Sequence, residues 1–479
     1  MKKWIAPLFA LLMVFTACTD DTLDDFSPKP EGDNSVNHWI EKIMRDHYLW
    51  YKELPDQSAL DFNKDPESFF RGLLSPNDGK DRPSGHLYFS TLQKAPSTKG
   101  LPDADDSYGF DFVTTKLRSQ DNLYNIALVI YVHDNSPASE AGLKRGDWIL
   151  GVNGPVGTIK DYGVLRKGGR ITLQLGVSSD DNKIELGRKI ELSASRGVEN
   201  TPFLKDSVYT IAGKKIGYLV YNQFLHGPEQ FNMENNSYDE YMNLLFKRFK
   251  NQGVEEFVLD LRYNGGGYTN SAQLLASLLA PQEVLNKTFC LYEYNDKNKK
   301  NNNSMGFLQT ADVLAGNLNL KRLFVLTGQP TASASELIIN GLRAYIPVRT
   351  IGDKTLGKTV GMSVFDGSKK HGWILSPVTF HVFNAQHKAD YQDGILPDVN
   401  INEFNYPLAE FGDLKDPLLG KAIEEITGYS SLRSATPQMD LGMSYEPANT
   451  YLNNLLVNPK SNIEVAEAET FVEGNLLHK

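Results

Sequence analysis

From about residue 205 onward, apolar runs of strand length alternate with longer segments of helical periodicity, and this alternation most limits the possible folds. Short apolar runs at residues 216–221 and 257–261 are typical of buried strands, whereas the spacing of apolar residues predicts helices over 238–250 and 271–280. Strands that alternate with helices form a largely parallel sheet, which the helices cover. The sequence therefore predicts an α/β core over residues 200–428.

The rest of the 479-residue chain divides into segments of different character, as expected at about 150 residues per domain. Residues 36–100 carry aromatic and aliphatic side chains at helical spacing, which predicts a small N-terminal helical domain. Residues 105–197 contain short β-like runs and turns, which predicts a β domain. Residues 429–479 show no clear pattern, so the fold of this tail stays open. The predicted fold class is multidomain α+β with three folded parts.

Residues 1–18 have the composition of a targeting segment. Lys2 and Lys3 provide a positive start, and residues 5–15 form an apolar stretch too short to span a bilayer. The small residues before Cys18 resemble the end of a bacterial lipoprotein signal, which implies a lipid on Cys18 and a membrane of the bacterial cell envelope. A plain secretory signal is the alternative. Residues 19–35 are rich in Asp and Pro and are expected to form a solvated tether.

Charge and cysteine content exclude several classes of function. The net charge of −10 and the pI near 5.5 argue against a nucleic-acid partner, which requires a basic face. The two cysteines, Cys18 and Cys290, cannot form a disulfide framework, and no Cys/His spacing indicates a zinc site. We therefore expect neither a metal nor another cofactor.

The β domain carries a recognisable motif. The run SPASEAGLKRGDWI at residues 136–149, followed by VNG at 152–154, closely resembles a PDZ domain. The resemblance places Gly109, Phe110, Asp111 and Phe112 at the loop that binds a peptide carboxylate, where backbone N–H groups and a strand edge receive the peptide. Asp111 adds a negative charge at this loop, which would weaken the binding of a carboxylate ligand. An unrelated β domain with similar turns is the alternative.

Three loops of the core are expected to lie at one edge of the sheet. A glycine run, Gly265 to Gly267, follows one predicted strand, Ser333 follows the apolar run at 323–326, and Lys358 follows another at 348–351. The carboxyl ends of parallel strands meet at one edge, where open α/β sheets bind ligands.

The residue types at this edge suit acyl transfer. Serine becomes a nucleophile when a base takes its proton, and a lysine can be that base if burial lowers its pKa from about 10.4. The N–H groups of Gly265 or Gly266 and of Ala334 would then form an oxyanion hole. The alternative is that Ser333 or Ser335 merely caps the following helix and Lys358 is an ordinary solvated lysine.

Three runs together resemble the carboxyl-terminal processing peptidases: DLRYNGGG at residues 260–267, TASASE at 331–336 and GDKTLGK at 352–358. Members of this family are Ser–Lys serine peptidases with a PDZ domain before the core, which is also the order in this chain. The resemblance implies that Ser333 is the nucleophile and Lys358 the general base, and it leaves Ser335 to cap the helix.

One position departs from the family pattern. Many members carry a glutamine four residues after the lysine, which orients it, whereas this chain has Met362. We expect that methionine does not orient the lysine by hydrogen bonding, so Ser363 or another polar group would have to do so. The related tricorn-type branch uses a histidine base, and His86 is the alternative base in this chain.

The sequence thus predicts a secreted, membrane-tethered serine endopeptidase that acts on protein or peptide substrates. Its PDZ domain would recognise substrate carboxyl termini or gate access to the site. The alternative from another class is a catalytically inactive PDZ-containing protein that binds peptides.

Overall fold

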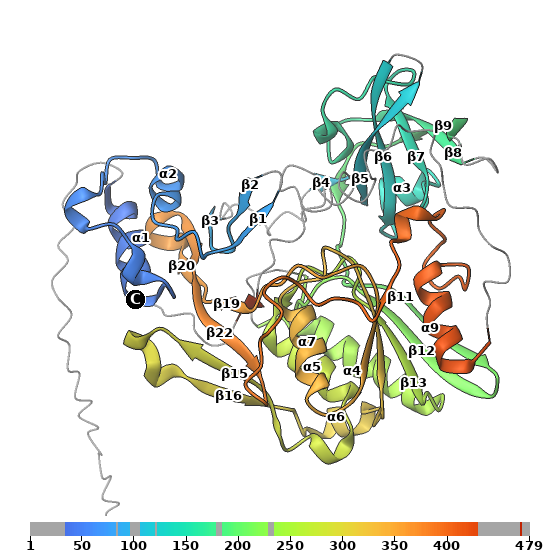
Figure 1. The fold of residues 1–479 in the computed structure, drawn as a ribbon. Helices are drawn as coiled ribbons and strands as arrows, with labels where there is room; N and C mark the ends of the chain where they lie inside the picture. Colours follow the sequence, from blue (N-terminus) through green and yellow to red (C-terminus); the bar gives the residue numbers. More distant parts are fainter. Residues whose placement is uncertain are drawn as a thin grey trace, which may run out of the picture.

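The computed structural model describes residues 34–82, 85–95, 106–119, 122–178, 184–228, 234–429 and 470–471, and the chain forms three folded parts (Figure 1). Cys18, the preceding signal segment and most of the predicted tether and tail lie outside the described residues. Within the described ranges, no helix has the length and apolar character needed to cross a membrane.

The core is built on a six-stranded sheet. Its strands, in spatial order, are β11 (Phe203–Ile211), β12 (Lys214–Tyr221), β13 (Glu256–Asp260), β17 (Leu323–Thr327), β18 (Val348–Gly352) and β23 (Val399–Asn400). All neighbouring pairs are parallel except β11 with β12. The prediction of a largely parallel sheet is confirmed.

Helices cover both faces of this sheet (Figure 1). The helices on one face are α4 (Ser237–Asn251), α5 (Thr269–Leu279), α6 (Ala311–Gly316) and α7 (Ala334–Arg343). Their apolar side chains share one buried cluster with β12, β13 and β17. The helix α9 (Pro417–Thr427) buries its apolar stripe against the opposite face, beside Val258 and Phe324. Because both faces are covered, the middle residues of the central strands β13 and β17 are apolar.

A second sheet flanks the first at the edge where β13 and β17 end. Its strands, in spatial order, are β14 (Gly267–Tyr268), β24 (Thr470–Phe471), β19 (Val360–Met362), β22 (Val378–Asn384), β15 (Thr288–Tyr294) and β16 (Asn303–Gly306). Smaller elements of the core are η4 (Gln282–Val284), η5 (Asp296–Asn301), β20 (Phe365–Gly367), α8 (Ser368–His371), β21 (Trp373–Ser376) and η6 (Glu403–Asn405). β24 therefore connects β14 to the rest of this sheet.

The N-terminal part is helical, as predicted, and is joined to the core. Its elements are α1 (Asn34–His47), η1 (Tyr51–Glu53), η2 (Gln57–Ala59), α2 (Pro66–Arg71), β1 (Lys80–Arg82), β2 (Gly85–Leu87) and β3 (Thr91–Lys94). Asp65 caps α2 by accepting a hydrogen bond from the Ser68 N–H, at 2.9 Å. β3 pairs with β21, and the apolar cluster of α1 and α2 continues through Phe89 to Leu356 and Met362 of the core.

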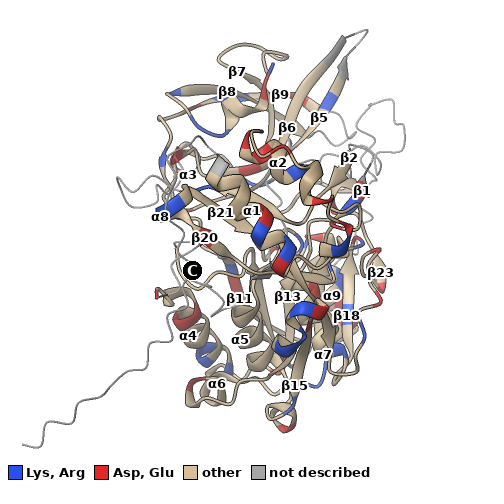
Figure 2. Cartoon of the chain, turned by 90° about the vertical axis from the view of Figure 1, so that its left-hand side faces the viewer, with Lys and Arg blue, Asp and Glu red and all other residues tan. Residues whose placement is uncertain are grey.

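The β domain is a five-stranded antiparallel sheet with its own apolar cluster. Its elements are β5 (Phe110–Ser119), β6 (Asn122–Val132), α3 (Pro137–Glu140), β7 (Trp148–Val152), η3 (Tyr162–Leu165), β8 (Ile171–Ser178) and β9 (Ile184–Leu192). The short strands β4 (Asp106–Ser107) and β10 (Arg196–Gly197) pair with each other where the chain enters and leaves the domain. Basic and acidic residues are interspersed over the elements drawn in Figure 2.

Candidate active site

Ser333 lies between β17 and α7, at the N-cap of the helix, as the sequence predicts. Its backbone is strained, because φ is +57° and ψ is −114° in a residue with a side chain. The residue is 2% exposed, and its Oγ has no hydrogen-bond partner among the described residues. A strained backbone costs about 1–3 kcal/mol and is concentrated at functional sites, so this turn is the strongest candidate for one.

Glu336 joins the Ser333 turn to the Lys358 loop. Its Oε2 accepts hydrogen bonds from the backbone N–H of Ser333 and from that of Lys358, each at 2.9 Å. Its Oε1 accepts from the Gly357 N–H at 2.7 Å and from the Thr355 hydroxyl. One fully buried carboxylate therefore fixes the backbone of both candidate catalytic residues.

Burial raises the pKa of Glu336 to about 7, although its hydrogen bonds from Thr355 and the three backbone N–H groups act in the opposite direction. No role was predicted for this residue from the sequence. The signal that could have found it is the spacing Ser333-x-x-Glu336, which is the pattern of a capping box, because the glutamate of such a box accepts the N-cap N–H.

Ser335 does not cap the helix, so that expectation was wrong. It is the second residue of α7, and its Oγ donates a hydrogen bond to the Asn264 carbonyl at 3.0 Å. The same carbonyl accepts from the Ala332 N–H at 3.1 Å. The hydroxyl of Ser335 thus ties the serine turn to the glycine loop.

The glycine loop lies directly against the serine. A Cβ on Gly266 would lie 2.8 Å from Ser333 Cβ and 3.2 Å from the Ala334 nitrogen, so a side chain would not fit there. The Gly266 φ of +116° also requires glycine. The Gly266 N–H already donates to Asn264 Oδ1 at 2.9 Å, and the N–H groups of Gly265 and Ala334 are the remaining candidates for an oxyanion hole.

Lys358 is 2% exposed, so its amine is largely removed from solvent. Its Nζ lies 3.7 Å from Met362 Sδ and 5.2 Å from the centre of the Phe89 ring. The expectation that Met362 cannot orient the lysine by hydrogen bonding was wrong, because its thioether sulfur, a weak acceptor, accepts a hydrogen bond from Lys358 Nζ. Ser363 bonds Thr379 Oγ1 at 2.7 Å instead. The N-terminal part thus supplies Phe89 as cover for the lysine.

The N-terminal part also anchors the lysine loop. Lys80 Nζ donates to the Leu356 carbonyl at 2.7 Å and to the Gln392 carbonyl at 3.2 Å. His86, on the neighbouring strand β2, has its Nδ1 2.7 Å from Asp81 Oδ1 and its Nε2 3.0 Å from the Asp78 carbonyl. Both ring nitrogens of His86 are therefore close to acceptors of the N-terminal part itself.

The loop predicted to bind a peptide carboxylate leads into the start of β5, an edge strand of the β domain. Gly109 has φ of +80°, and Phe110 and Phe112 belong to the apolar cluster of the domain. The Asp111 carboxylate accepts a short hydrogen bond from Tyr131, whose hydroxyl also accepts from Asn222 Nδ2 of the core at 3.1 Å. Asp111 is therefore linked to Asn222 of the core through the Tyr131 hydroxyl.

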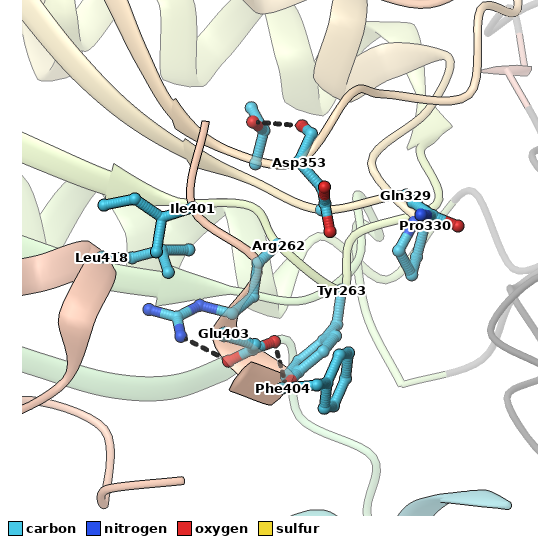
Figure 3. Close-up of a pocket in the computed structure, with 11 residues that line it drawn as sticks. Arg262, Tyr263, Gln329, Pro330, Asp353, Ile401, Glu403, Phe404 and Leu418 are labelled. Carbon is cyan, nitrogen blue, oxygen red and sulfur yellow. Dashed lines mark hydrogen bonds and ion pairs between the residues drawn. The ribbon is translucent and has the colours of Figure 1, made fainter. Parts of the chain in front are cut away.

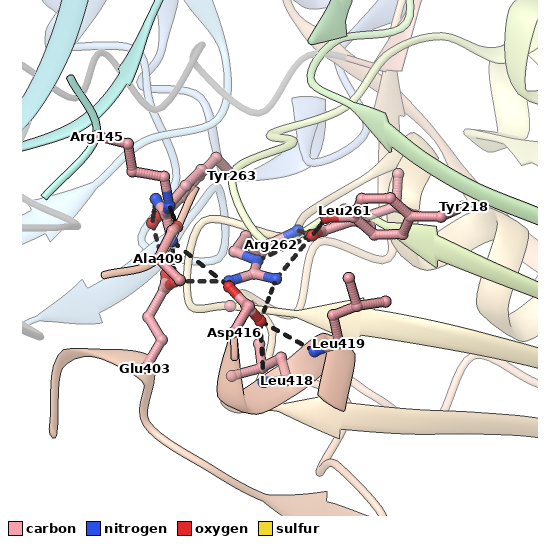
Figure 4. A network of polar contacts seen from close by, with 12 residues as sticks. Arg145, Tyr218, Leu261, Arg262, Tyr263, Glu403, Ala409, Asp416, Leu418 and Leu419 are labelled. Atoms are coloured by element: carbon pink, nitrogen blue, oxygen red, sulfur yellow. Dashed lines mark hydrogen bonds and ion pairs between the residues drawn. The ribbon is translucent and has the colours of Figure 1, made fainter. Parts of the chain in front are cut away.

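A buried ionic network joins the β domain to the core (Figure 4). Arg145 Nη2 donates to Glu403 Oε2 at 2.6 Å, and Arg262 Nη1 donates to the same oxygen at 2.7 Å. Arg262 also donates to Asp416, and the Tyr263 hydroxyl donates to Glu403 Oε1 at 2.6 Å. Arg262 and Tyr263 immediately precede Asn264 and the glycine loop.

A small pocket lies beside this network, and neither Ser333 nor Lys358 lines it (Figure 3). Its walls include Arg262 and Tyr263, the turn 328–330 that precedes the serine, and the carboxylates of Asp353 and Glu403. Burial, together with the charge of Glu403, raises the pKa of Asp353 to about 6. The pocket therefore lies between the ionic network and the turn that precedes Ser333.

Comparison with protein-family models covers each of the three parts. Residues 215–401 match peptidase family S41, residues 35–91 match the peptidase S41 N-terminal domain, and residues 128–172 match a PDZ domain. The predicted multidomain fold class is therefore confirmed.

Individual relatives agree with these matches. A crystal structure of a protein described as an S41 protease from Bacteroides fragilis is 34% identical, with a TM-score of 0.73, and covers 84% of this chain and 98% of its own. A carboxyl-terminal-processing protease of Synechocystis is 25% identical over 284 residues, which are 59% of this chain and 60% of that protein. Carboxy-terminal processing protease CtpB of Bacillus subtilis is 23% identical over 398 residues, which are 81% of this chain and 73% of that protein.

The chain thus spans less than two-thirds of the Synechocystis relative and nearly all of the Bacteroides protein. The matches to the core, to the N-terminal domain and to the PDZ domain occur in the order in which the structure places these parts. The chain belongs to peptidase family S41, and its relatives include bacterial carboxyl-terminal processing proteases.

Proposed function

We propose that the chain is a serine endopeptidase in which Ser333 is the nucleophile and Lys358 the general base. The observation that carries this proposal is the position of Glu336, whose Oε2 lies 2.9 Å from the backbone nitrogens of both residues. A helix cap alone would need only the hydrogen bond from the Ser333 N–H to Glu336, and not the one from the Lys358 N–H. Fixing both loops on one carboxylate holds a nucleophile and a base in register.

The reaction follows from the groups present. Lys358 Nζ, as a neutral amine, takes the proton of the Ser333 hydroxyl while Oγ attacks the carbonyl carbon of the scissile peptide bond. The N–H groups of Gly265 and Ala334 donate to the oxygen that becomes negative, and Gly266 keeps this loop close by lacking a Cβ. The lysine returns the proton to the leaving amine, and water then hydrolyses the acyl ester.

Lys358 is favoured over His86 as the base. The Lys358 Nζ lies beside Phe89 and Met362, and burial of the lysine favours the neutral amine that a base requires. The His86 nitrogens, in contrast, lie within hydrogen-bond distance of Asp81 and the Asp78 carbonyl. The tricorn-type alternative would require one His86 nitrogen to leave its partner and to reach the Ser333 hydroxyl, while the other could keep its acceptor.

Protein or peptide substrates fit the PDZ domain, whose edge strand β5 would receive a carboxyl-terminal segment near Gly109 to Phe112. The hydrogen bond from Tyr131 to Asp111 supports this site, because it offsets part of the negative charge beside the incoming carboxylate. A lipid on Cys18 would hold the peptidase at a membrane of the bacterial cell envelope. Intact-mass analysis of the processed chain tests this: an unmodified Cys18 would contradict it.

The enzyme proposal is tested by covalent labelling with a fluorophosphonate probe, which reacts with activated serines. We expect a single adduct on Ser333 and none in Ser333→Ala. A folded wild-type chain that stays unlabelled would contradict the proposal and favour the alternative, a peptide-binding protein without catalysis.

A further inference from the structure

The strands β14 and β19 of the second sheet directly follow the glycine loop and the Lys358 loop of the candidate site. β14 begins at Gly267, directly after Gly265 and Gly266, and β19 begins at Val360, two residues after Lys358. Met362 of β19 is itself the residue whose sulfur lies 3.7 Å from Lys358 Nζ. The slot between these two strands therefore adjoins the glycine loop, which lies against Ser333, and Met362, whose sulfur contacts Lys358.

Each of the two strands has its other edge occupied by the core. The outer edge of β14 pairs with Phe224, since the Phe224 N–H donates to the Gly266 carbonyl at 2.9 Å and the Tyr268 N–H to the Phe224 carbonyl at 2.8 Å. The outer edge of β19 pairs with β22. The inner edges of β14 and β19 face each other across the width of one strand, roughly 10 Å at the usual strand spacing.

This slot is filled by the C-terminal segment of the same chain. Thr470 and Phe471 form β24, which lies parallel to β14, with Thr470 opposite Gly267 and Phe471 opposite Tyr268. Phe471 is also opposite Met362 of β19. The short dark red strand beside β19 in Figure 1 is this segment. An extended peptide that pairs with both edges uses backbone groups, so many sequences can enter by the same contacts.

The chain is long enough to reach its own slot. Tyr429, just after α9, and Thr470 are separated by 40 residues, which can span up to roughly 130 Å when extended. Occupation within one molecule also raises the effective concentration of the segment far above that of a separate peptide.

We infer that the slot between β14 and β19 binds one extended peptide strand and that the segment around Thr470 and Phe471 is its internal ligand, which competes with substrate. The competition rests on the proposed peptidase function, whereas the binding itself does not. The segment is thus an occupant that a substrate must displace before its peptide bond can reach Ser333.

The test uses the full-length chain with two proline substitutions, Thr470→Pro and Phe471→Pro, which remove both N–H donors of β24. The matched control is Thr470→Val with Phe471→Tyr, which keeps both N–H groups and high strand propensity. A fluorescein-labelled peptide of residues 465–476 is titrated against each chain in the Ser333→Ala background. Thermal unfolding checks that the proline chain retains its core.

If the slot is occupied nine-tenths of the time, the labelled peptide should bind the proline chain about tenfold more tightly than the control chain. In chains with Ser333, the proline substitutions should lower KM for a peptide substrate by the same factor and leave kcat unchanged. Equal binding of the peptide to both chains would overturn the inference. Tighter binding without hydrolysis by any chain would uphold the slot and its ligand and would refute the proposed enzyme instead.

Discussion

Two buried polar centres lie within a few residues of each other on the loop that follows β13. One is the network of Arg145, Arg262 and Glu403 at the junction with the PDZ domain, and the other is the site of Ser333 and Lys358. In the network each charged group meets an opposite charge at 2.6–2.8 Å. In the site Ser333 Oγ has no hydrogen-bond partner among the described residues, and the Lys358 amine lies beside a sulfur and an aromatic ring.

On the proposed function, the difference between the two centres is one between a structural and a catalytic use of buried polar groups. Removing one member of a paired network leaves a charge uncompensated, so the network holds two domains in one arrangement. The candidate site instead holds Ser333 in a strained backbone and buries Lys358, which costs stability and, in the proposed mechanism, favours the neutral amine that a base requires.

Ser333→Ala should lower the rate of peptide hydrolysis on the order of 10⁴-fold or more, because it removes the nucleophile. It should not destabilise the fold, since Oγ makes no hydrogen bond to a described residue. Ser335→Ala is the matched control: it removes the bond to the Asn264 carbonyl and should cost about 1 kcal/mol of stability while most activity remains. Both are measured on a fluorogenic peptide and by urea unfolding. Equal loss of activity in the two variants would refute the assignment.

Lys358→Ala and Lys358→Arg should each reduce turnover about 10³-fold, the range expected for loss of a general base. Arginine retains the charge but does not release its proton at accessible pH, so it cannot replace the lysine. His86→Ala should keep most of the activity, and the rate of acyl-enzyme formation distinguishes the two candidates. Wild-type acylation by Lys358→Ala together with none by His86→Ala would make the histidine, and not the lysine, the general base.

Arg145→Ala should lower the free energy of unfolding by about 3–5 kcal/mol, because it leaves Glu403 buried with one charge partner fewer. Arg170→Ala in the same domain is the control. Its partner Glu191 is 3.4 Å away, and the two side chains are 73% and 64% exposed, so the cost should stay below about 1 kcal/mol. Chemical denaturation of the full chain measures both. Similarly small losses of unfolding free energy in both variants would show that the network does not stabilise the junction between the PDZ domain and the core.

Glu336 provides the smallest and most specific test, through pH. Its pKa of about 7 in the folded chain lies above its ordinary value of 4.5, so the folded state holds the proton more tightly than the unfolded state. Between pH 4.5 and 7 the free energy of unfolding should therefore fall as pH rises, by up to about 3 kcal/mol in total.

Glu336→Gln should remove this pH dependence, whereas Ser335→Ala should retain it. The measurement is urea unfolding at a series of pH values. The glutamine variant should also lose activity, since its amide nitrogen cannot accept the N–H groups that the carboxylate receives. An unchanged slope in Glu336→Gln would show that another group titrates in this range.

The sequence by itself determined the fold class and the meeting of the three loops. Apolar runs of strand length alternating with helical stripes can bury their surfaces only as a parallel sheet between helices. Parallel strands bring their carboxyl ends to one edge, so Gly265, Ser333 and Lys358 were predicted to converge without knowledge of any contact. The helix cap at Ser333 was also local, because its glutamate is three residues away.

Only the tertiary structure decided which groups surround the site. The bond from Glu336 to the Lys358 N–H spans 22 residues, and Phe89 and Lys80 come from another part of the chain. The sulfur of Met362 accepts a hydrogen bond from the Lys358 amine, which only the packed position of β19 allows. Ser335 donates to the Asn264 carbonyl, 71 residues away in the chain, instead of capping its helix. Periodicity states which face of an element is buried, but the partner of a buried polar atom is set by how the elements pack.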